Sequence, residues 1–401
     1  MTRIKDYSEC VNPTDTQTIP IDPPHGSEGE TQRVQLFNIV SAKHKEWLRA
    51  NGFVYTDSQL CVHGVLPNNF AIASGGGKYN WMVEIPRKNW DPTNGFASAE
   101  KALAFTVNNL QKRIFIGKYI ASKPDTEARS LPNQIPLVGQ TFDQQLTQIA
   151  ALNSAGVTGW HMMTNAEWAL VAQISKGLGV TVYGNNNYGR DVDDKSVTFR
   201  MSDPTLFGGS TGDGKSYTGS GGHRTSHNNQ LDGIFDLNGN VWERVNGLRL
   251  NNSEIQIFVN NDAADLTKDF SAGSASWKAI LDDASLVAPG TAGTLKIAAN
   301  GNITKTAPGS TSSSKTFESV DCESDVSSSS AGIALLKKLG LYPYTTGLGS
   351  DTFYYNTSGE FIALRGGSWG YGAAAGLFDL FLLNARADST DSGGFRLAFV
   401  L

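Results

Sequence analysis

The chain has 401 residues, which is enough for two or three domains at roughly 100–200 residues each. Hydrophobic residues make up 39% and charged residues only 18%, and with 43 glycines this composition favours a loop-rich fold with strands over a helical bundle. The net charge of -5 argues against nucleic acid as the main partner, because proteins that bind nucleic acid usually carry a basic face.

The cysteines and the first residues bear on the compartment. The 3 cysteines, Cys10, Cys61 and Cys322, lie far apart without a CxxC pair, so neither a disulfide framework nor a zinc site is predicted. The first residues are not followed by the apolar segment of a secretory signal. No apolar run approaches the ~20 residues of a membrane span. We therefore expect a protein that is made in the cytoplasm and has no membrane anchor.

Residues 1–110 are interpreted as an N-terminal attachment or assembly region. Its first 30 residues are polar and rich in Pro, Thr and Asp, as in an arm. Two helices and two strands are predicted after this arm: helices over residues 41–50 and 98–110, and strands over residues 69–74 and 81–85.

A second unit begins with a predicted strand over residues 113–120. Thr141 and Gln144 form a capping box that predicts the start of a helix, which we expect to end at Gly156. A second capping box, of Thr164 and Glu167, predicts a helix that stops near Gly177. The following residues, 183–232, are rich in Gly, Asn and Ser with little periodicity and are predicted to be long loops.

Residues 251–355 change character again and are interpreted as a β-rich insertion. Alternating polarity predicts strands over residues 254–259 and 293–298. Stretches rich in Ser and Thr at residues 309–315 and 327–330 are predicted to be linkers.

Two chemical motifs are set aside. Residues 209–216, GSTGDGKS, fit the phosphate-loop formula GxxxxGK[ST], but that loop needs a strand before it and a helix after it, and neither is predicted. His223 and His227 have the spacing of two metal ligands on one helix face. Their Gly- and Asn-rich surroundings instead favour two solvated loop histidines.

Three blocks of sequence carry the strongest pattern. They are residues 160–168 (WHMMTNAEW), residues 233–243 (GIFDLNGNVWE) and the closing pair 364–369 (LRGGSW) with 393–397 (GGFRL). In this order they resemble the formylglycine-generating-enzyme branch of the C-type lectin fold. The resemblance covers residues 111–250 and 356–401 and implies that they form one ligand-binding domain.

The resemblance implies an α+β fold of the C-type lectin type, formylglycine-generating-enzyme subtype, with a β-rich insertion and a mixed N-terminal region. The residue types in the blocks are suited to a scaffold. Trp168, Trp242 and Trp369 are expected to bury large surfaces in a loop-heavy fold. Arg365 and Arg396 are expected to clamp loop carbonyls or carboxylates.

The enzymatic members of this family are disfavoured. Its oxidases use a cysteine pair in the C-terminal segment, and this chain has no Cys after Cys322. The related iron-dependent sulfoxide synthases need a histidine triad, and there is no His after His227. We therefore expect that the protein is not an enzyme and requires no cofactor.

Residues 367–396 are similar, without a gap, to the variable region of proteins diversified by diversity-generating retroelements. A common phage-borne version of that region repeats asparagine at positions that we call the variable positions: Gly370, Tyr371, Ala374, Phe381, Leu383, Asn384, Asp388, Thr390 and Ser392. These retroelements mutate adenines, typically in AAC codons. Every residue that replaces Asn here can be reached from AAC by changing adenines alone.

The resemblance implies that the variable positions bind the ligand. Alternation with a period of two gives an inward set of Phe378, Leu380 and Leu382 and an outward set of Asp379, Phe381 and Leu383. An exposed Phe381 near Tyr371 would form an apolar patch, which is typical of a binding site. The alternative is a strand that is buried on both faces.

The turn between Asp236 and Glu243 holds a structural calcium ion in the enzymes that the chain resembles. The resemblance therefore implies a calcium site formed by Asp236, Gly239, Val241 and Glu243, since hard oxygen ligands suit that ion. The alternative is that Asp236 caps a turn and Glu243 pairs with an arginine.

We therefore interpret the chain as a receptor-binding adhesin of a phage tail fibre or baseplate, located in the virion. Its expected partners are a host-cell surface protein or glycan at the variable positions, and phage tail or baseplate proteins at the N-terminal region. A homotrimer is compatible with common phage-fibre assemblies. One alternative is a ligand-binding adhesin on a bacterial cell surface. The other is an oxidase of the formylglycine-generating type, which the missing cysteines disfavour.

Overall fold

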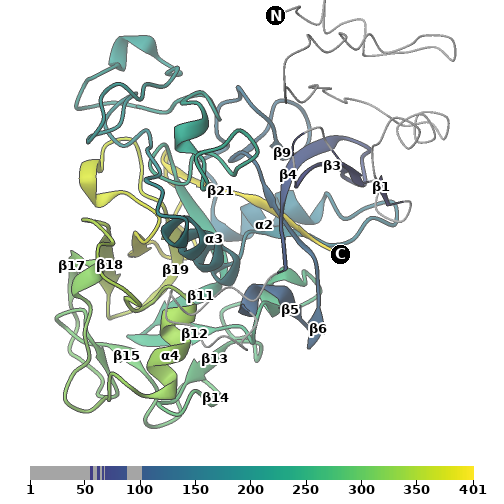
Figure 1. The fold of residues 1–401 in the computed structure, drawn as a ribbon. Coiled ribbons are helices and arrows are strands. Elements are labelled where there is room, and N and C mark those ends of the chain that lie inside the picture. Colours follow the sequence, from purple (N-terminus) through teal and green to yellow (C-terminus); the bar gives the residue numbers. More distant parts are fainter. Residues whose placement is uncertain (1–54, 57–60, 64–65, 67, 88–101) are drawn as a thin grey trace, which may run out of the picture.

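The computed structural model describes residues 55–56, 61–63, 66, 68–87 and 102–401. The predicted arm at residues 1–30 and the predicted helix at residues 41–50 lie outside these ranges. The described part combines α-helices with a larger number of β-strands (Figure 1), which confirms the predicted α+β class.

The first sheet contains 7 strands, and all its neighbouring strands are antiparallel. Their order is β1 (Tyr55–Thr56), β2 (Cys61–His63), β3 (Asn69–Ala73), β4 (Tyr79–Ile85), β7 (Ile114–Gly117), β22 (Leu397–Val400) and β10 (Trp160–Met162). The strands predicted over residues 69–74 and 81–85 are confirmed. The strand predicted over residues 113–120 is shorter, since β7 ends at Gly117, whose carbonyl accepts a hydrogen bond from the Arg396 side chain.

The second sheet contains 11 strands around the long strand β11 (Trp242–Asn251). Along its main path lie β14 (Leu286–Val287), β13 (Lys278–Ile280), β12 (Glu254–Ile257), β11, β19 (Glu360–Arg365), β20 (Leu380–Leu382), β18 (Thr352–Asn356) and β17 (Ser312–Thr316). Beside this path, β15 (Lys296–Ile297) pairs with β12 and with β16 (Ile303–Thr304), and β21 (Gly393–Phe395) pairs with β11.

The predicted linker at residues 309–315 is wrong in its second half, which belongs to β17. This strand pairs with β18 along its whole length but is almost entirely exposed. An exposed edge strand of Ser, Lys and Thr has no alternation of polarity, so its sequence cannot be distinguished from a linker. Strands from residues 251–355 thus belong to the same sheet as β11, β19 and β20.

The described residues form three α-helices: α2 (Phe142–Ala150), α3 (Asn165–Gly177) and α4 (Ala331–Lys338). Both capping boxes are present, with the Thr141 and Thr164 side chains accepting hydrogen bonds from the backbone of Gln144 and Glu167. Helix α2 ends before the predicted Gly156. After the helix, the Asn153 side chain donates a hydrogen bond to the Trp160 carbonyl and accepts one from the Trp160 N–H.

The helix predicted over residues 98–110 is wrong for its described part, residues 102–110. A short 3-10 helix, η3 (Leu103–Phe105), leads into a two-stranded hairpin of β5 (Thr106–Val107) and β6 (Leu110–Gln111). The hairpin turn consists of Asn108 and Asn109 with φ of 50° and 61°. Asparagine tolerates this left-handed conformation, which a tight hairpin turn requires.

Residues 183–232 form long loops, as predicted, with only two short 3-10 helices, η4 (Pro204–Leu206) and η5 (His223–Thr225). The structure has neither a strand before residues 209–216 nor a helix after them. The Lys215 ammonium donates to Asp213 and to the Asp391 carbonyl. This segment therefore lacks the context of a phosphate loop.

The remaining short elements are β8 (Ala121–Ser122) with β9 (Arg129–Ser130), and the 3-10 helices η6 (Asp262–Ala264), η7 (Phe317–Ser319) and η8 (Gly372–Ala374). Helix α3 is buried on all sides except near its C-terminal end. In the part of the chain that the structure describes, no helix is long and apolar enough to cross a membrane.

Candidate ligand-binding surface

The C-terminal segment leaves β19 through two glycines that fix its path. Gly366 and Gly367 have φ of 90° and 78°. A Cβ atom at Gly367 would lie 2.3 Å from the Ala375 Cβ, so the turn and the loop that follows are held together too closely for any side chain there. The segment then passes through η8, β20 and β21 before it ends in β22.

The variable positions are all at least partly exposed, and the buried residues among them are residues 375–380 and Leu382. The other residues between them, such as Ala373, Ala387 and Asp391, are themselves partly or fully exposed. Gly370, Tyr371 and Asp388 are exposed, and the other variable positions are partly exposed. The predicted inward set is confirmed, because Phe378, Leu380 and Leu382 are buried: these side chains are 6%, 2% and 3% exposed.

The outward set is confirmed for Phe381 and Leu383 but wrong for Asp379, which is fully buried. Alternation requires an extended strand, and β20 begins only at Leu380. Asp379 lies in a turn, where its N–H donates to the Gly376 carbonyl at 3.2 Å.

Four aromatic side chains meet at this surface: Trp242, Tyr354, Tyr371 and Phe381, which we call the aromatic cluster. The Trp242 ring centroid lies 4.9 Å from that of Tyr371 and 4.8 Å from that of Phe381. Tyr354 lies 5.9 Å from Tyr371 and 5.3 Å from Phe381 by the same measure. Trp242 is buried beneath the others, Tyr371 is 36% exposed, and Tyr354 and Phe381 are partly exposed.

The pairing of β18 with β20 brings Tyr354 into this cluster. The two strands are parallel, with Tyr354 opposite Phe381. Tyr354 was not predicted as a site residue. Residues 352–356 alternate between partly exposed and buried in the structure, but their sequence, TFYYN, has no alternation of polarity that predicts an outward Tyr354. Burial raises the pKa of Tyr354 to about 12, so its hydroxyl stays neutral at physiological pH.

The other variable positions border the cluster or follow neighbouring strands. The Ser392 carbonyl accepts a hydrogen bond from the Trp242 N–H at 2.8 Å, and the Asp388 carbonyl accepts one from Arg244 on the same strand. Gly370 lies beside Tyr188. The remaining positions are placed by backbone contacts: Ala374 ends η8, Leu383 follows β20, Asn384 accepts from Ile362, and Thr390 accepts from Gly139 and Gly393.

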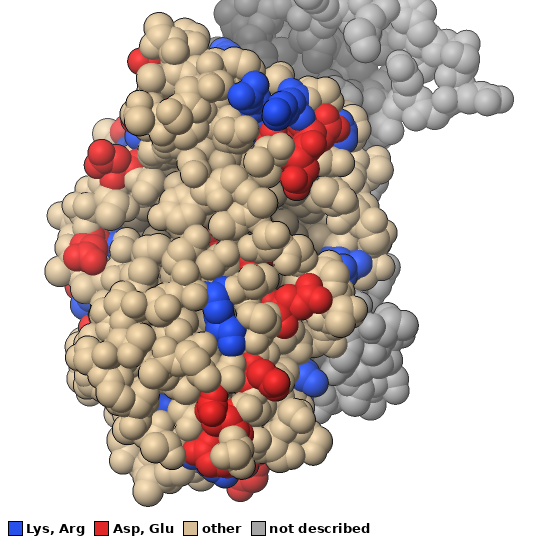
Figure 2. All heavy atoms as spheres, turned by 90° about the vertical axis from the view of Figure 1, so that its left-hand side faces the viewer, with Lys and Arg blue, Asp and Glu red and all other residues tan. Residues whose placement is uncertain are grey.

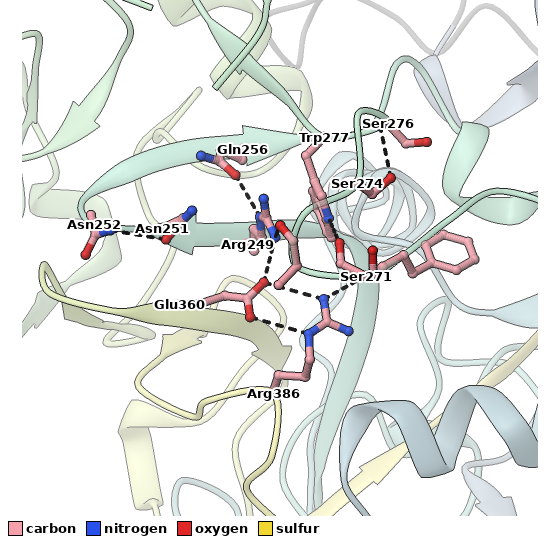
Figure 3. A network of polar contacts seen from close by, with 12 residues as sticks. Arg249, Asn251, Asn252, Gln256, Ser271, Ser274, Ser276, Trp277, Glu360 and Arg386 are labelled. Carbon is pink, nitrogen blue, oxygen red and sulfur yellow. Dashed lines mark hydrogen bonds and ion pairs between the residues drawn. The ribbon is translucent and has the colours of Figure 1, made fainter. Parts of the chain in front are cut away.

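A polar network fixes the backbone among the last variable positions (Figure 3). Arg386 donates to Glu360 on β19 and, at 2.7 Å, to the Phe270 carbonyl. Glu360 also accepts from Arg249 on β11 at 2.6 Å. Arg386 follows Asn384 and precedes Asp388, so this stretch is attached to two strands of the sheet through a side chain that is not itself a variable position.

The predicted clamping roles of two arginines are confirmed. Arg396 donates to both carboxylate oxygens of Glu243, at 2.8 and 2.6 Å, and to the carbonyls of Gly117 and Phe235. Arg365 donates to the Asn165 side-chain oxygen and to the Gly340 carbonyl.

Of the residues that the resemblance implies for calcium, Glu243 is engaged by an arginine, whereas the buried Oδ1 of Asp236 has no hydrogen-bond partner among the described residues. Both Glu243 oxygens are engaged by the Arg396 guanidinium, so a divalent cation there would lie against a buried positive charge. Asp236 accepts from the Gly219 N–H through one oxygen, and burial raises its pKa to about 6. Gly239 and Val241 would offer only backbone carbonyl oxygens; the contacts of Gly239 with Gly366 and of Val241 with Ile120 and Trp369 involve an N–H group and a side chain instead. The alternative is confirmed for Glu243, which pairs with Arg396, but Asp236 accepts from the distant Gly219 rather than capping its own turn.

The two histidines do not share a helix face, as expected, but His227 is not solvated. It is buried, and its Nδ1 accepts a hydrogen bond from the Ile234 N–H at 2.9 Å. Burial lowers the pKa of His227 to about 4, which keeps the ring neutral. His223 is exposed.

The left-hand side of the molecule in Figure 1, where β17 and β18 lie, is mostly uncharged, as Figure 2 shows. Isolated acidic and basic groups are scattered over it without a large patch of one sign. No protein-family model matches the chain, and a search of curated proteins finds no relative.

Proposed function

We propose that the chain is a non-catalytic receptor-binding protein with a C-type lectin fold, whose variable positions recognise a protein or glycan on a host-cell surface. The observation that carries the proposal is that every variable position is at least partly accessible, while residues 375–380 and Leu382, which lie among them, are buried. A surface built in this way can change its side chains without changing its backbone.

The aromatic cluster supplies the anchors of this surface. Rigid aromatic side chains give a large contact area at a low cost in conformational entropy, and they dominate the affinity of many interfaces. Tyr371 and Phe381 are the two variable positions in the cluster, and both rest on the buried Trp242. The proposal includes display on a phage tail through the N-terminal region, where several copies on one particle would raise avidity by roughly 10²–10⁴.

The proposal is tested by replacing the two anchors together. The double variant Tyr371→Asn, Phe381→Asn is compared with the wild-type chain for attachment of the labelled protein to intact host cells. We expect attachment to weaken by at least about tenfold, since interface anchors commonly contribute 2 kcal/mol or more. The matched control is Leu110→Asn, Leu231→Asn, which replaces two exposed apolar side chains outside the surface and should leave attachment unchanged.

Full attachment by a double variant that melts like the wild type would overturn the proposal. If the double variant loses stability, Gly370→Arg serves instead, because Gly370 is exposed and the added side chain obstructs the surface without removing a contact. The DNA beside the gene gives a second test. A reverse-transcriptase gene and a near-copy of the coding stretch for residues 367–396 are expected there.

A further inference from the structure

A pocket of about 440 Å³ is lined in part by residues 373 and 375–378, which lie between β19 and β20. One wall is the C-terminal part of α3 with residues 179–182, and the opposite wall is residues 347–351 with residues 373–378. Its volume is within the range of pockets that bind small molecules. The side chains of Val180, Leu348 and Leu377 make part of the lining apolar.

Asp351 contributes a buried carboxylate to this lining. Asp351 is only 9% exposed, and its Oδ2 accepts a hydrogen bond from the Phe378 N–H at 2.7 Å. Its Oδ1 lies where two glycines of the lining leave room. A Cβ atom at Gly376 would lie 2.1 Å from Oδ1, and one at Gly349 would lie 3.7 Å from it. Gly376 therefore has to lack a side chain for the carboxylate to occupy this place in the pocket lining.

The lining carries two further charged side chains, which are of opposite sign. Asp193 is exposed in the lining, and the Lys176 ammonium is bound to the Gly347 carbonyl. The lining amides are also engaged: Asn238 donates to the Val182 carbonyl, and Asn186 donates to Asn238. The C-terminal end of α3 adds the partial negative charge of a helix C-terminus.

We propose that this pocket binds a primary ammonium group on a short apolar stem, with Asp351 as its counter-ion. The group belongs to a small alkyl- or arylamine or to a lysine side chain of a protein partner, which present the same chemistry. This site is separate from the aromatic cluster and does not depend on the function proposed above.

The protonation of Asp351 makes the binding sensitive to pH. Burial raises the pKa of Asp351 to about 7, so at neutral pH a large share of the carboxyl is protonated. An ammonium ion binds the ionised form, and its affinity therefore rises as the pH increases from 6 to 8. Two charged groups, Asp379 and Arg365, interact electrostatically near Asp351. Asp193 and Lys176 also belong to the pocket lining.

The experiment measures the affinity of the full chain for benzylamine and for benzyl alcohol, its uncharged analogue, by titration calorimetry. We expect benzylamine to bind at least about tenfold more tightly, because hydrogen bonds to charged groups contribute roughly 1.5–3 kcal/mol. Asp351→Asn keeps an acceptor for the Phe378 N–H and removes the charge, so this preference should disappear. The matched control is Asp283→Asn, an exposed aspartate outside the pocket.

A second variant guards against a loss of folding in Asp351→Asn. Ala373 is exposed at the lining, and Ala373→Arg adds bulk and positive charge there, so it should abolish benzylamine binding without a change in melting temperature. The anchor variant Tyr371→Asn, Phe381→Asn should bind benzylamine normally, which separates this proposal from the function proposed above.

Replacing benzylamine by a capped lysine peptide identifies the source of the ammonium group. Tighter binding of the peptide assigns the pocket to a protein partner, and tighter binding of the free amine assigns it to a small molecule. The proposal is overturned if neither binds the folded protein, or if benzyl alcohol binds as tightly as benzylamine.

Discussion

Arg396 connects the two sheets through a single side chain. It lies between β21, which pairs with β11 in the second sheet, and β22, which belongs to the first sheet. Its guanidinium donates to Glu243 on β11 and to the Gly117 carbonyl on β7. The side chain is fully buried, and it links the strands at the point where the chain passes from one sheet to the other.

Removing the charge of its partner should therefore be costly. The variant Glu243→Gln leaves the Arg396 cation buried without a carboxylate, and breaking such a pair costs about 3–5 kcal/mol of unfolding free energy. Urea unfolding at pH 7 measures this loss. The control Glu84→Gln breaks the more exposed pair with Arg113 and should cost less than about 1 kcal/mol. Equal losses in the two variants would contradict the role given to Arg396.

The sequence predicted the role of a buried side chain where its chemistry permits few alternatives. A buried arginine must find several acceptors, which is why Arg365 and Arg396 were predicted as clamps. Asp379 and His227 escaped prediction for the opposite reason. Alternation placed Asp379 outward, and the Gly- and Asn-rich surroundings of His227 favoured a solvated loop. The turn before β20 and the loop around Ile234 bury these two side chains.

The two predicted capping boxes differ in what surrounds them. Each threonine side chain accepts from a backbone N–H within its own helix start, an interaction that local sequence specifies completely. Thr164 is also buried, and its hydroxyl donates to the Asn261 side chain. Thr141 belongs to a box whose hydrogen bonds are exposed.

We expect the two caps to respond differently to the same change. Thr141→Ala removes one capping interaction and should lower the unfolding free energy by about 1 kcal/mol. Thr164→Ala also leaves the buried Asn261 oxygen without its donor, which adds roughly 1–3 kcal/mol. Denaturant unfolding of both variants tests this order. A Thr141→Ala loss as large as that of Thr164→Ala would show that burial adds nothing to the cap.

Elements that depend on distant partners were the ones that the sequence did not indicate. Strand β17 carries no alternation and exists because β18 lies beside it. The parallel pairing of β18 with β20 joins residues 352–356 to residues 380–382, and β19 pairs with β20 from the other side. No local pattern specifies these neighbours, so the position of Tyr354 in the aromatic cluster required the structure.

At the scale of the whole molecule, the buried acids make stability depend on pH. Neither oxygen of Asp379 has a hydrogen-bond partner among the described residues, and burial raises the pKa of this carboxyl well above its usual value. Burial also raises the pKa of Asp351 to about 7. An acid with a raised pKa in the folded state binds more protons when folded than when unfolded, so its contribution to stability is lost as the pH rises.

We therefore predict that replacing Asp379 by Asn changes the pH dependence of stability. Between pH 5 and pH 8, the folded wild type must either ionise the buried Asp379 carboxyl or hold a proton that the unfolded chain has released. Both lower its unfolding free energy as the pH rises, and the Asn variant is free of both effects. The unfolding free energy of Asp379→Asn relative to the wild type should increase steadily over this range, whatever constant offset the amide introduces. The neutral His227 has a lowered pKa and contributes with the opposite sign below about pH 6.5, but equally in both proteins. Urea unfolding at several pH values measures the difference, with Asp283→Asn as an exposed control that should remain parallel to the wild type. If the Asp379→Asn curve is also parallel to the wild type, Asp379 has an ordinary pKa, and its burial carries no electrostatic cost.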